Sequence, residues 1–189
     1  MSHKIYTTEA IVVGSRFNNT SDKSFLLFTR SAGMLWATGK SVREERSKQR
    51  FALQEFSLIR ASLVKGRHGW RLGSVVALDN FFTHVDNRES RLAIVKVIKI
   101  IRQFLHGESN NFELFDDTVE VLNKLKSQDK NQLENLVDIF TLRFLFTLGY
   151  IAPEPIFASF LKEKRWWELP PVPKEAKKAI EKAQKFSHL

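Results

Sequence analysis

A glycine-lysine-serine sequence stands at Gly39–Ser41, downstream of a second glycine, Gly33. The same residue types close the phosphate-binding loop of many nucleotide hydrolases, where the pattern G-x-x-x-x-G-K-[ST] wraps backbone N–H groups around a phosphate. Here five residues separate the two glycines, one more than the pattern allows, and they are the strand-like residues Met34–Thr38. No apolar helical pattern follows Ser41 either. The spacing therefore argues against an ATPase.

The segment behind this sequence carries a dense run of positive charge. Its basic residues are Lys40, Arg43, Arg46, Lys48 and Arg50, against only Glu44 and Glu45. Lysine, arginine and serine side chains bind the phosphate oxygens of a nucleic-acid backbone without reading its sequence. We therefore interpret the run as a long loop between two strands that contacts a DNA backbone.

Other candidate residues come from predicted turns and strand ends that could meet the same rim. The basic ones are Arg16, Lys23, Arg30, Lys65, Arg67 and Arg71, and the aromatic ones are Trp36, Phe51, Phe56 and Trp70. Unpaired bases stack on exposed aromatic rings. Most aromatic residues pack in cores, but Trp70 stands beside a predicted hairpin turn and is the one that we expect to be exposed.

Composition narrows the possible functions. The chain has 189 residues and a formal net charge of +9; residues 1–80 hold 13 basic and 6 acidic residues, residues 81–150 hold 9 and 10, and residues 151–189 hold 8 and 5. A positive field concentrated in one part attracts polyanions, most often nucleic acid. There is no cysteine, and the five histidines lack the short spacings of a metal centre. We expect no catalytic residue, no metal and no cofactor.

Membrane association is not predicted from the sequence. No stretch is apolar enough to span a bilayer, and the N-terminal residues carry no signal-peptide pattern. We therefore expect a cytoplasmic protein without a membrane partner.

The first part of the chain has the pattern of strands joined by short turns. The apolar runs cover residues 9–17, 24–30, 33–39, 56–64 and 70–81. Two glycines in the last turn favour a hairpin, and in the fourth run apolar residues alternate with Arg60 and Ser62, as in a strand with one buried face. Five strands without an intervening helix suit a small closed barrel.

From residue 88 onward the spacing of apolar residues becomes helical. The apolar face of a first helix consists of Ile94, Ile98, Ile101 and Leu105. Asn110 with Glu113, and Asn131 with Glu134, resemble capping boxes that open two further helices, and Gly149 would end the second of these. A last helix is predicted over residues 174–186. We therefore predict an α+β chain with two domains, a β-barrel over residues 1–82 and an α-helical bundle over residues 83–189.

Several of these segments together resemble the RecO family of bacterial recombination mediators, from about residue 5 to about residue 153. The most specific pieces are the pair Asp22-Lys23 before "LLFTR", the spacing of Gly33, Gly39 and Arg43, the sequence "LQEFSL", and the helix end "LR…LGY" at Leu142–Tyr150. None of them is a catalytic signature.

The resemblance implies an N-terminal OB-fold, a helical domain, binding of single- and double-stranded DNA at the nucleoid, and annealing of complementary strands. It also implies two protein partners, RecR and the C-terminal tail of single-stranded-DNA-binding protein, and help in loading RecA on coated strands. Arg143 matches a basic position of the "LR…LGY" helix and could meet that acidic tail; a plain solvent-exposed arginine is the alternative. The DNA-binding residues that we expect are Arg16, Lys23, Lys40, Arg43, Arg46, Lys48, Arg50, Lys65, Arg67, Trp70 and Arg71.

Two alternatives remain open. Many members of the family follow "LGY" with a four-cysteine zinc module, whereas residues 151–189 contain no cysteine. Either an aromatic cluster of Phe157, Phe160, Trp166 and Trp167 packs there without metal, or the chain is a divergent relative. The other alternative concerns function: a protein-interaction adaptor whose helical domain binds partners and whose basic barrel is incidental.

Overall fold

In the computed structural model the protein divides into two compact units. The structure describes residues 5–18, 21–42, 44, 47 and 49–186. The first unit holds the residues up to His84 together with His106–Phe115, and the second holds Val85–Leu105 and the residues from Asp116 onward. The segment 106–115, which the sequence placed with the helices, therefore belongs to the barrel unit.

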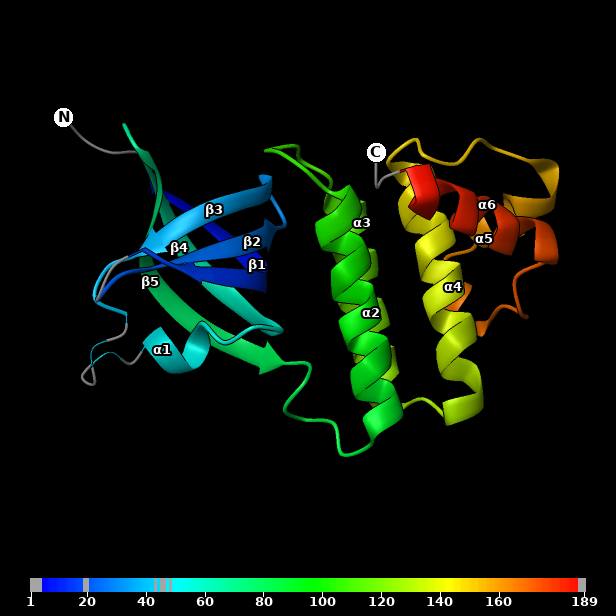
Figure 1. Ribbon diagram of the computed structural model, residues 1–189, viewed down its shortest axis with the longest axis horizontal. Helices are drawn as coiled ribbons and strands as arrows, with labels where there is room; N and C mark the ends of the chain where they lie inside the picture. Colours follow the sequence, from blue (N-terminus) through cyan, green and yellow to red (C-terminus); the bar gives the residue numbers. More distant parts are fainter. Residues whose placement is uncertain (1–4, 19–20, 43, 45–46, 48, 187–189) are drawn as a thin grey trace. The chain divides into compact units, whose positions relative to one another are not determined.

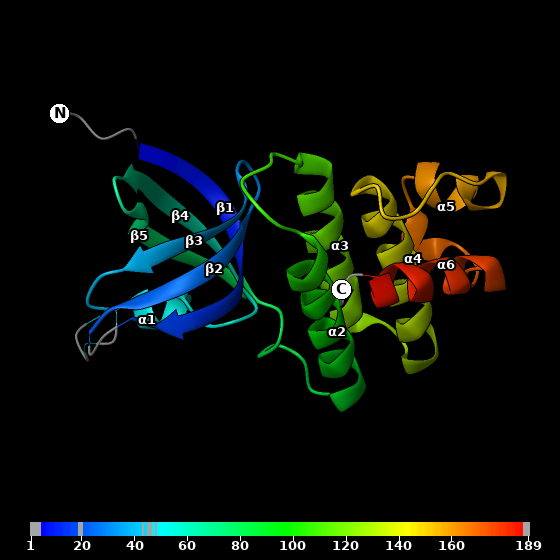
Figure 2. The same cartoon turned by 45° about the horizontal axis from the view of Figure 1, so that its top comes forward.

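Five strands of the first unit form a closed barrel (Figures 1 and 2). They are β1 (Ile5–Phe17), β2 (Lys23–Thr29), β3 (Gly33–Gly39), β4 (Ser57–Gly66) and β5 (Gly69–Asn80). Their order around the barrel is β1-β2-β3-β5-β4, and every neighbouring pair is antiparallel except β3 and β5. The long strand β1 closes the barrel because its first half pairs with β4 and its second half with β2. The five predicted strands are confirmed, with bounds shifted by up to four residues.

A short helix, α1 (Gln49–Ala52), lies between β3 and β4, so the prediction of no intervening helix is wrong. One turn of helix is too short to leave a periodic pattern in the sequence. Gln49 Nε2 donates a hydrogen bond to the carbonyl oxygen of Gly73 in β5 at 2.7 Å. Leu53, which follows the helix, is buried in the barrel core. The helix thus covers β5 near the place where β5 pairs with β3 over only two residues.

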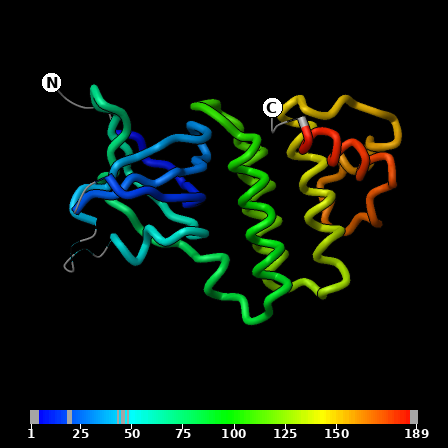
Figure 3. The backbone as a smooth tube through the Cα atoms, in the orientation of Figure 1, coloured from blue at the N-terminus to red at the C-terminus, as the bar shows by residue number. Residues whose placement is uncertain are grey.

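The segment 106–115 is fixed against the turn between β2 and β3 (Figure 3). The backbone N–H of Met34 donates to the carbonyl oxygen of Gly107 at 3.0 Å. Gly33 has a φ of +66°, and a Cβ at this position would lie 2.4 Å from the carbonyl oxygen of Ser109. Only glycine allows the two backbones to approach this closely.

The second unit is a helical bundle in which α2, α5 and α6 contact α4 (Figure 2). Its elements are α2 (Arg88–Phe104), α3 (Phe112–Ser127, whose first residues belong to the barrel unit), α4 (Lys130–Thr147), η1 (Pro155–Phe157), α5 (Ala158–Lys162), η2 (Trp166–Glu168) and α6 (Lys174–Phe186). The predicted apolar face of α2 is buried. None of the helices among the described residues combines the length and hydropathy needed to cross a membrane.

The C-terminal end of α4 confirms the predicted role of Gly149, which has a φ of +81°. Its N–H donates to the carbonyl oxygen of Phe146, and the N–H of Tyr150 donates to that of Leu145, each at 2.9 Å. These two bonds form a Schellman motif, in which glycine avoids the strain of a left-handed backbone.

The two predicted capping boxes are wrong. Helix α3 is capped by Asn111, whose Oδ1 accepts the N–H of Leu114 at 3.0 Å, and not by its neighbour Asn110. Helix α4 starts after Asp129, so Asn131 lies inside its first turn. Adjacent polar residues compete for one cap, and the sequence does not decide between them.

Arg143 of α4 is engaged inside the helical unit. Its Nε donates to Asp117 Oδ2 at 2.9 Å, and its Nη2 lies 2.9 Å from the same oxygen. The other carboxylate oxygen of Asp117 accepts the indole N–H of Trp166 at 3.2 Å. The side chain of Arg143 is only 16% exposed. The interpretation of Arg143 as a plain solvent-exposed arginine is therefore wrong.

Arg143 also terminates the short helix α5. Its Nη1 donates to the carbonyl oxygens of Phe160 at 2.7 Å and Leu161 at 3.1 Å, which lack partners within so short a helix. All three guanidinium nitrogens thus bind groups of the same unit, and this geometry does not support a contact with an acidic tail. A four-cysteine zinc centre does not fit this chain, which has no cysteine. Of the predicted aromatic cluster, Phe157, Phe160 and Trp166 are buried, whereas Trp167 is only partly buried.

We predict that Arg143→Met lowers the free energy of unfolding by about 3 kcal/mol, because the partly buried carboxylate of Asp117 loses its charged partner and two carbonyl oxygens lose their donor. Urea unfolding followed by tryptophan fluorescence measures the loss. Arg165→Met is the matched control, since it removes an exposed pair with Glu168 and should change stability by less than about 0.5 kcal/mol. Equal losses in the two variants would contradict the role given to Arg143.

We predict that Gly33→Ala destabilises the barrel unit by at least about 2 kcal/mol more than Gly107→Ala. Both residues have a positive φ, but a Cβ at Gly107 meets no atom within 4 Å, whereas one at Gly33 meets the backbone of Ser109. Chemical denaturation of the two variants measures the difference. Similar losses would show that segment 106–115 does not need the close approach.

Candidate nucleic-acid interface

A β-bulge turns Arg16 to the outside of the barrel. Ala10 and Val12 point into the core, and strict alternation would send Arg16 inside as well. The register of β1 against β2 shifts between Val12 and Gly14, so one extra residue reverses the alternation. Arg16 therefore pairs with Ser24 on the outward side and is exposed.

Outward side chains of four strands form what we call the strand face. It consists of Arg16 from β1, Ser24 and Leu26 from β2, Trp36 and Thr38 from β3, and Arg71 from β5. Arg16 pairs with Ser24, Ser24 with Thr38, and Thr38 with Arg71. The two arginines therefore end a row that crosses four strands, roughly 14 Å apart at the usual strand spacing.

Trp36 is the aromatic residue of the strand face, and 39% of it is exposed. The guanidinium carbon of Arg16 lies 4.3 Å from the centre of its ring. Beside them, the hydroxyl oxygens of Ser24 and Thr38 are 3.2 Å apart, and Asn18 Nδ2 donates to Ser24 Oγ at 2.7 Å. This arrangement places a planar cation and an aromatic ring beside the partly exposed Thr38, whereas Ser24 itself is buried.

Two predicted lysines lie at the end of β2 and β3 that borders the strand face. Lys23 pairs with Gly39 across these strands, and exposed Lys40 follows directly. The ammonium of Lys23 lies 5.4 Å from the ring of Phe17, which is 71% exposed and adjoins Arg16 in β1. Of the predicted residues, the structure thus brings together Arg16, Lys23, Lys40 and Arg71.

The glycine-lysine-serine sequence does not form a phosphate-binding loop. The N–H of Ser41, which would have to face a phosphate, donates to Asp22 Oδ1 at 2.9 Å. Val42 turns inward and is buried, and the next helix starts only at Gln49. The backbone N–H needed for a nucleotide phosphate is already used by a carboxylate.

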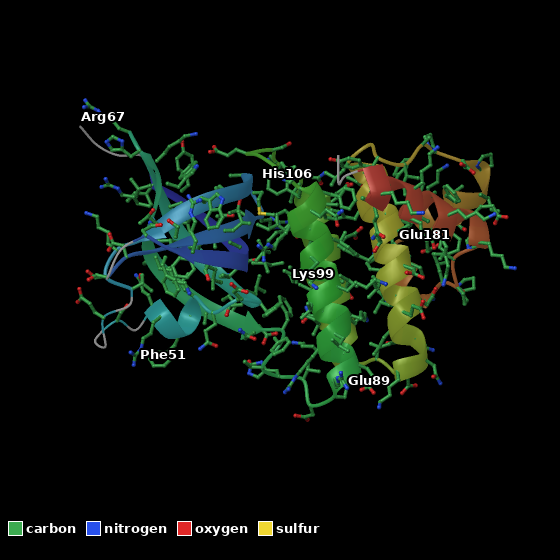
Figure 4. All side chains as sticks on the ribbon, in the orientation of Figure 1. Phe51, Arg67, Glu89, Lys99, His106 and Glu181 are labelled. Atoms are coloured by element: carbon green, nitrogen blue, oxygen red, sulfur yellow. The ribbon has the colours of Figure 1, made fainter. Side chains whose placement is uncertain are left out.

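The other predicted basic residues do not all reach this surface. Lys65 and Arg67 belong to the β4–β5 hairpin, and Arg50 lies on α1, 4.7 Å from the ring of Phe51. Figure 4 shows Arg67 and Phe51 at opposite ends of the barrel. The expected single rim is therefore not formed. Arg43, Arg46 and Lys48 lie outside the described residues and stay predictions.

The prediction that Trp70 is exposed and stacks on bases is wrong, since only 8% of the residue is exposed. It pairs with Ala37, which points into the barrel, and so joins the core despite its place beside the hairpin turn. Its indole N–H donates to Glu108 Oε1 at 2.8 Å, and Tyr6 packs edge-on against its ring at 5.4 Å. The face of the Trp70 ring is therefore not open to a base, and its N–H is bound by Glu108.

Glu108, which contacts the β4–β5 hairpin, is a residue that sequence analysis missed. Its second oxygen, Oε2, accepts a hydrogen bond from Lys65 Nζ at 2.9 Å. The indole N–H of Trp70, and then the ammonium of Lys65, lower the pKa of the Glu108 carboxyl below its ordinary value. Glu108 lies in a segment without periodicity, so no signal in the sequence pointed to this contact.

Comparisons with known proteins agree on one family. Residues 91–153 match the family described as "Recombination protein O C terminal". Three curated relatives are each named DNA repair protein RecO. The one from Clostridium novyi is 26% identical over 146 residues, 77% of this chain and 57% of the relative. The one from Syntrophobacter fumaroxidans is 33% identical over 152 residues, with shares of 78% and 58%.

The third relative, from Pelotomaculum thermopropionicum, is 30% identical over 150 residues, 78% of this chain and 56% of the relative. The chain thus spans a little over half the length of the curated relatives that it matches. The family match covers most of α2 and all of α3 and α4, whereas the matches to relatives extend over about three quarters of the chain. Because the family match and the relatives point to the same name, the chain belongs to the RecO family of DNA repair proteins.

Proposed function

We propose that the protein binds single- and double-stranded DNA through the strand face and acts in recombinational repair as a mediator without catalytic activity. The observation that carries the proposal is the placement of Arg16, Trp36 and Arg71 on one outer surface of the barrel. Guanidinium groups neutralise backbone phosphates, and an exposed indole offers a stacking platform to an unpaired base.

We further propose that the barrel is an OB-fold. The strand order β1-β2-β3-β5-β4, with β3 parallel to β5 and a short helix between β3 and β4, supports this assignment. OB-folds bind oligonucleotides on the face of their second and third strands. The strand face includes both of these strands, β2 and β3, so fold and site support the same function.

Annealing follows from the same chemistry. Two complementary strands repel each other through their phosphates, and basic side chains that neutralise one strand lower this repulsion. Stacking on Trp36 would hold bases apart from one another and leave their hydrogen-bonding edges accessible. Neither contact reads the sequence or breaks a covalent bond, which supports a binding function rather than an enzymatic one.

The partners of the whole protein belong to the proposal as well. Membership of the family supports contacts with RecR and with the tail of single-stranded-DNA-binding protein, and help in loading RecA. Residues 1–189 contain no cysteine that could contribute to a zinc module.

A protein-interaction adaptor is the second candidate. A groove of about 500 Å³ in the helical unit favours it, lined among others by Tyr150, Ala183 and Lys182. The two candidates separate experimentally, because an adaptor would capture its partner equally well after the strand face has been altered and after nuclease treatment.

We predict that the triple variant Arg16→Glu, Lys23→Glu and Arg71→Glu binds single-stranded DNA far more weakly. The slope of log Kobs against log salt should fall by about 2, since each lost phosphate contact contributes about 0.7. Fluorescence anisotropy of a labelled oligonucleotide over a salt titration measures the slope, and a strand-annealing assay follows the consequence.

A matched control changes the net charge equally at exposed residues of the helical unit: Lys99→Glu, Arg102→Glu and Lys178→Glu. This variant should keep most of the binding. Equal losses of DNA affinity in the two triple variants would contradict the assignment of the strand face as the binding surface. Absence of DNA binding by the unaltered protein would overturn the proposed function.

We predict that Trp36→Ala weakens single-strand binding by about 1 to 3 kcal/mol, the usual loss of one stacked base. Duplex binding should change little, because paired bases do not reach the ring. Trp36→Phe should retain most of the affinity, since it keeps an aromatic face. Measuring the three proteins with single-stranded and duplex oligonucleotides tests this, and equal losses on both substrates would rule out stacking.

A further inference from the structure

Glu108 is bound like an anionic ligand on the outside of the barrel unit. Its two carboxylate oxygens accept one hydrogen bond each, from the indole N–H of Trp70 at 2.8 Å and from the ammonium of Lys65 at 2.9 Å. One donor is neutral and directional, and the other is charged. Together they make a two-point cradle for an oxyanion.

The cradle is held in place independently of Glu108. The ring of Trp70 is buried in the core, and Tyr6 packs against it edge-on. The ammonium of Lys65 lies 5.1 Å from the centre of the same ring. Lys65 and Trp70 are also cross-strand neighbours in the β4–β5 hairpin. Removal of the carboxylate would therefore leave both donors near their present positions.

Glu108 is partly exposed to solvent and can be exchanged. The side chains of Lys65 and Glu108 are 57% and 42% exposed, so their pairing contributes little to stability. The backbone of segment 106–115 is fixed at the neighbouring residue, Gly107, whose carbonyl oxygen accepts the N–H of Met34. This hydrogen bond does not involve the carboxylate of Glu108. A rotation of the Glu108 side chain alone would open the cradle.

We propose that Lys65 and the indole N–H of Trp70 form a binding subsite for a backbone phosphate of single-stranded DNA, and that Glu108 occupies it in the free protein. A phosphodiester carries one negative charge over two free oxygens, as the carboxylate does, and so matches the same two donors. The inference rests on the proposed DNA-binding function and adds a contact on the hairpin, apart from the strand face. Glu108 competes with DNA there and limits the affinity.

The variant Glu108→Gln tests the subsite. The amide oxygen can still accept the N–H of Trp70, so the fold is kept, while the charge that holds Lys65 is removed. We expect single-strand affinity to rise several-fold at low salt and the salt slope to grow by about 0.7, the value of one phosphate contact. In the Lys65→Ala background, Glu108→Gln should leave the salt slope unchanged.

Glu113→Gln is the matched control, because it removes an exposed negative charge from the same segment. It should leave the salt slope unchanged. The subsite is overturned if Glu113→Gln increases the slope as much as Glu108→Gln, or if the effect of Glu108→Gln persists without Lys65. An unaltered protein that binds DNA while Glu108→Gln changes nothing overturns the subsite alone, whereas an unaltered protein that does not bind DNA overturns the proposed function.

Discussion

Side chains of a strand alternate between its two sides, and in this barrel the alternation decides which residues can meet a ligand. Trp36 and Trp70 lie on adjacent strands, yet one is outward and the other belongs to the core. The bulge in β1 reverses the alternation for the residues that follow it, and it therefore turns Arg16 outward beside Trp36. A barrel with strict alternation would bury that arginine, which is costly without a partner.

Hydrophobic periodicity predicted most of the helices and strands, but it did not predict which side chains point outward from them. The strands and α6 follow from apolar runs, and Gly149 ends α4 as its residue type indicates. The bulge at Val13 leaves no signal, because an inserted apolar residue extends an apolar run without interrupting it. The contacts of Glu108 could not be predicted either, since they join residues 38 or more positions apart through a segment without regular structure.

The helical unit meets a different constraint after α4, where the elements are too short to be stable alone. Helix α5 has five residues, and η1 and η2 have three each. Three buried aromatic residues supply apolar contacts, and Arg143 supplies donors for the carbonyl oxygens at the end of α5. Asp117 binds the arginine and accepts the indole N–H of Trp166. The ion pair between Asp117 and Arg143 therefore holds both α5 and η2 in place. A metal centre would hold such short elements together through side-chain ligands. Here Arg143 holds them through hydrogen bonds to backbone carbonyl oxygens.

The contacts of the basic residues explain why net charge alone is a poor guide to the binding surface. Arg16, Lys23 and Arg50 lie over aromatic rings. Such a contact orients a cation without neutralising it, so its charge stays available to a phosphate. A carboxylate partner, as at Lys65, orients the cation equally well but cancels its field until the partner is displaced. Lys65 combines both kinds of contact, since it lies over the ring of Trp70 and binds Glu108, so its charge becomes available to a phosphate once the carboxylate is displaced.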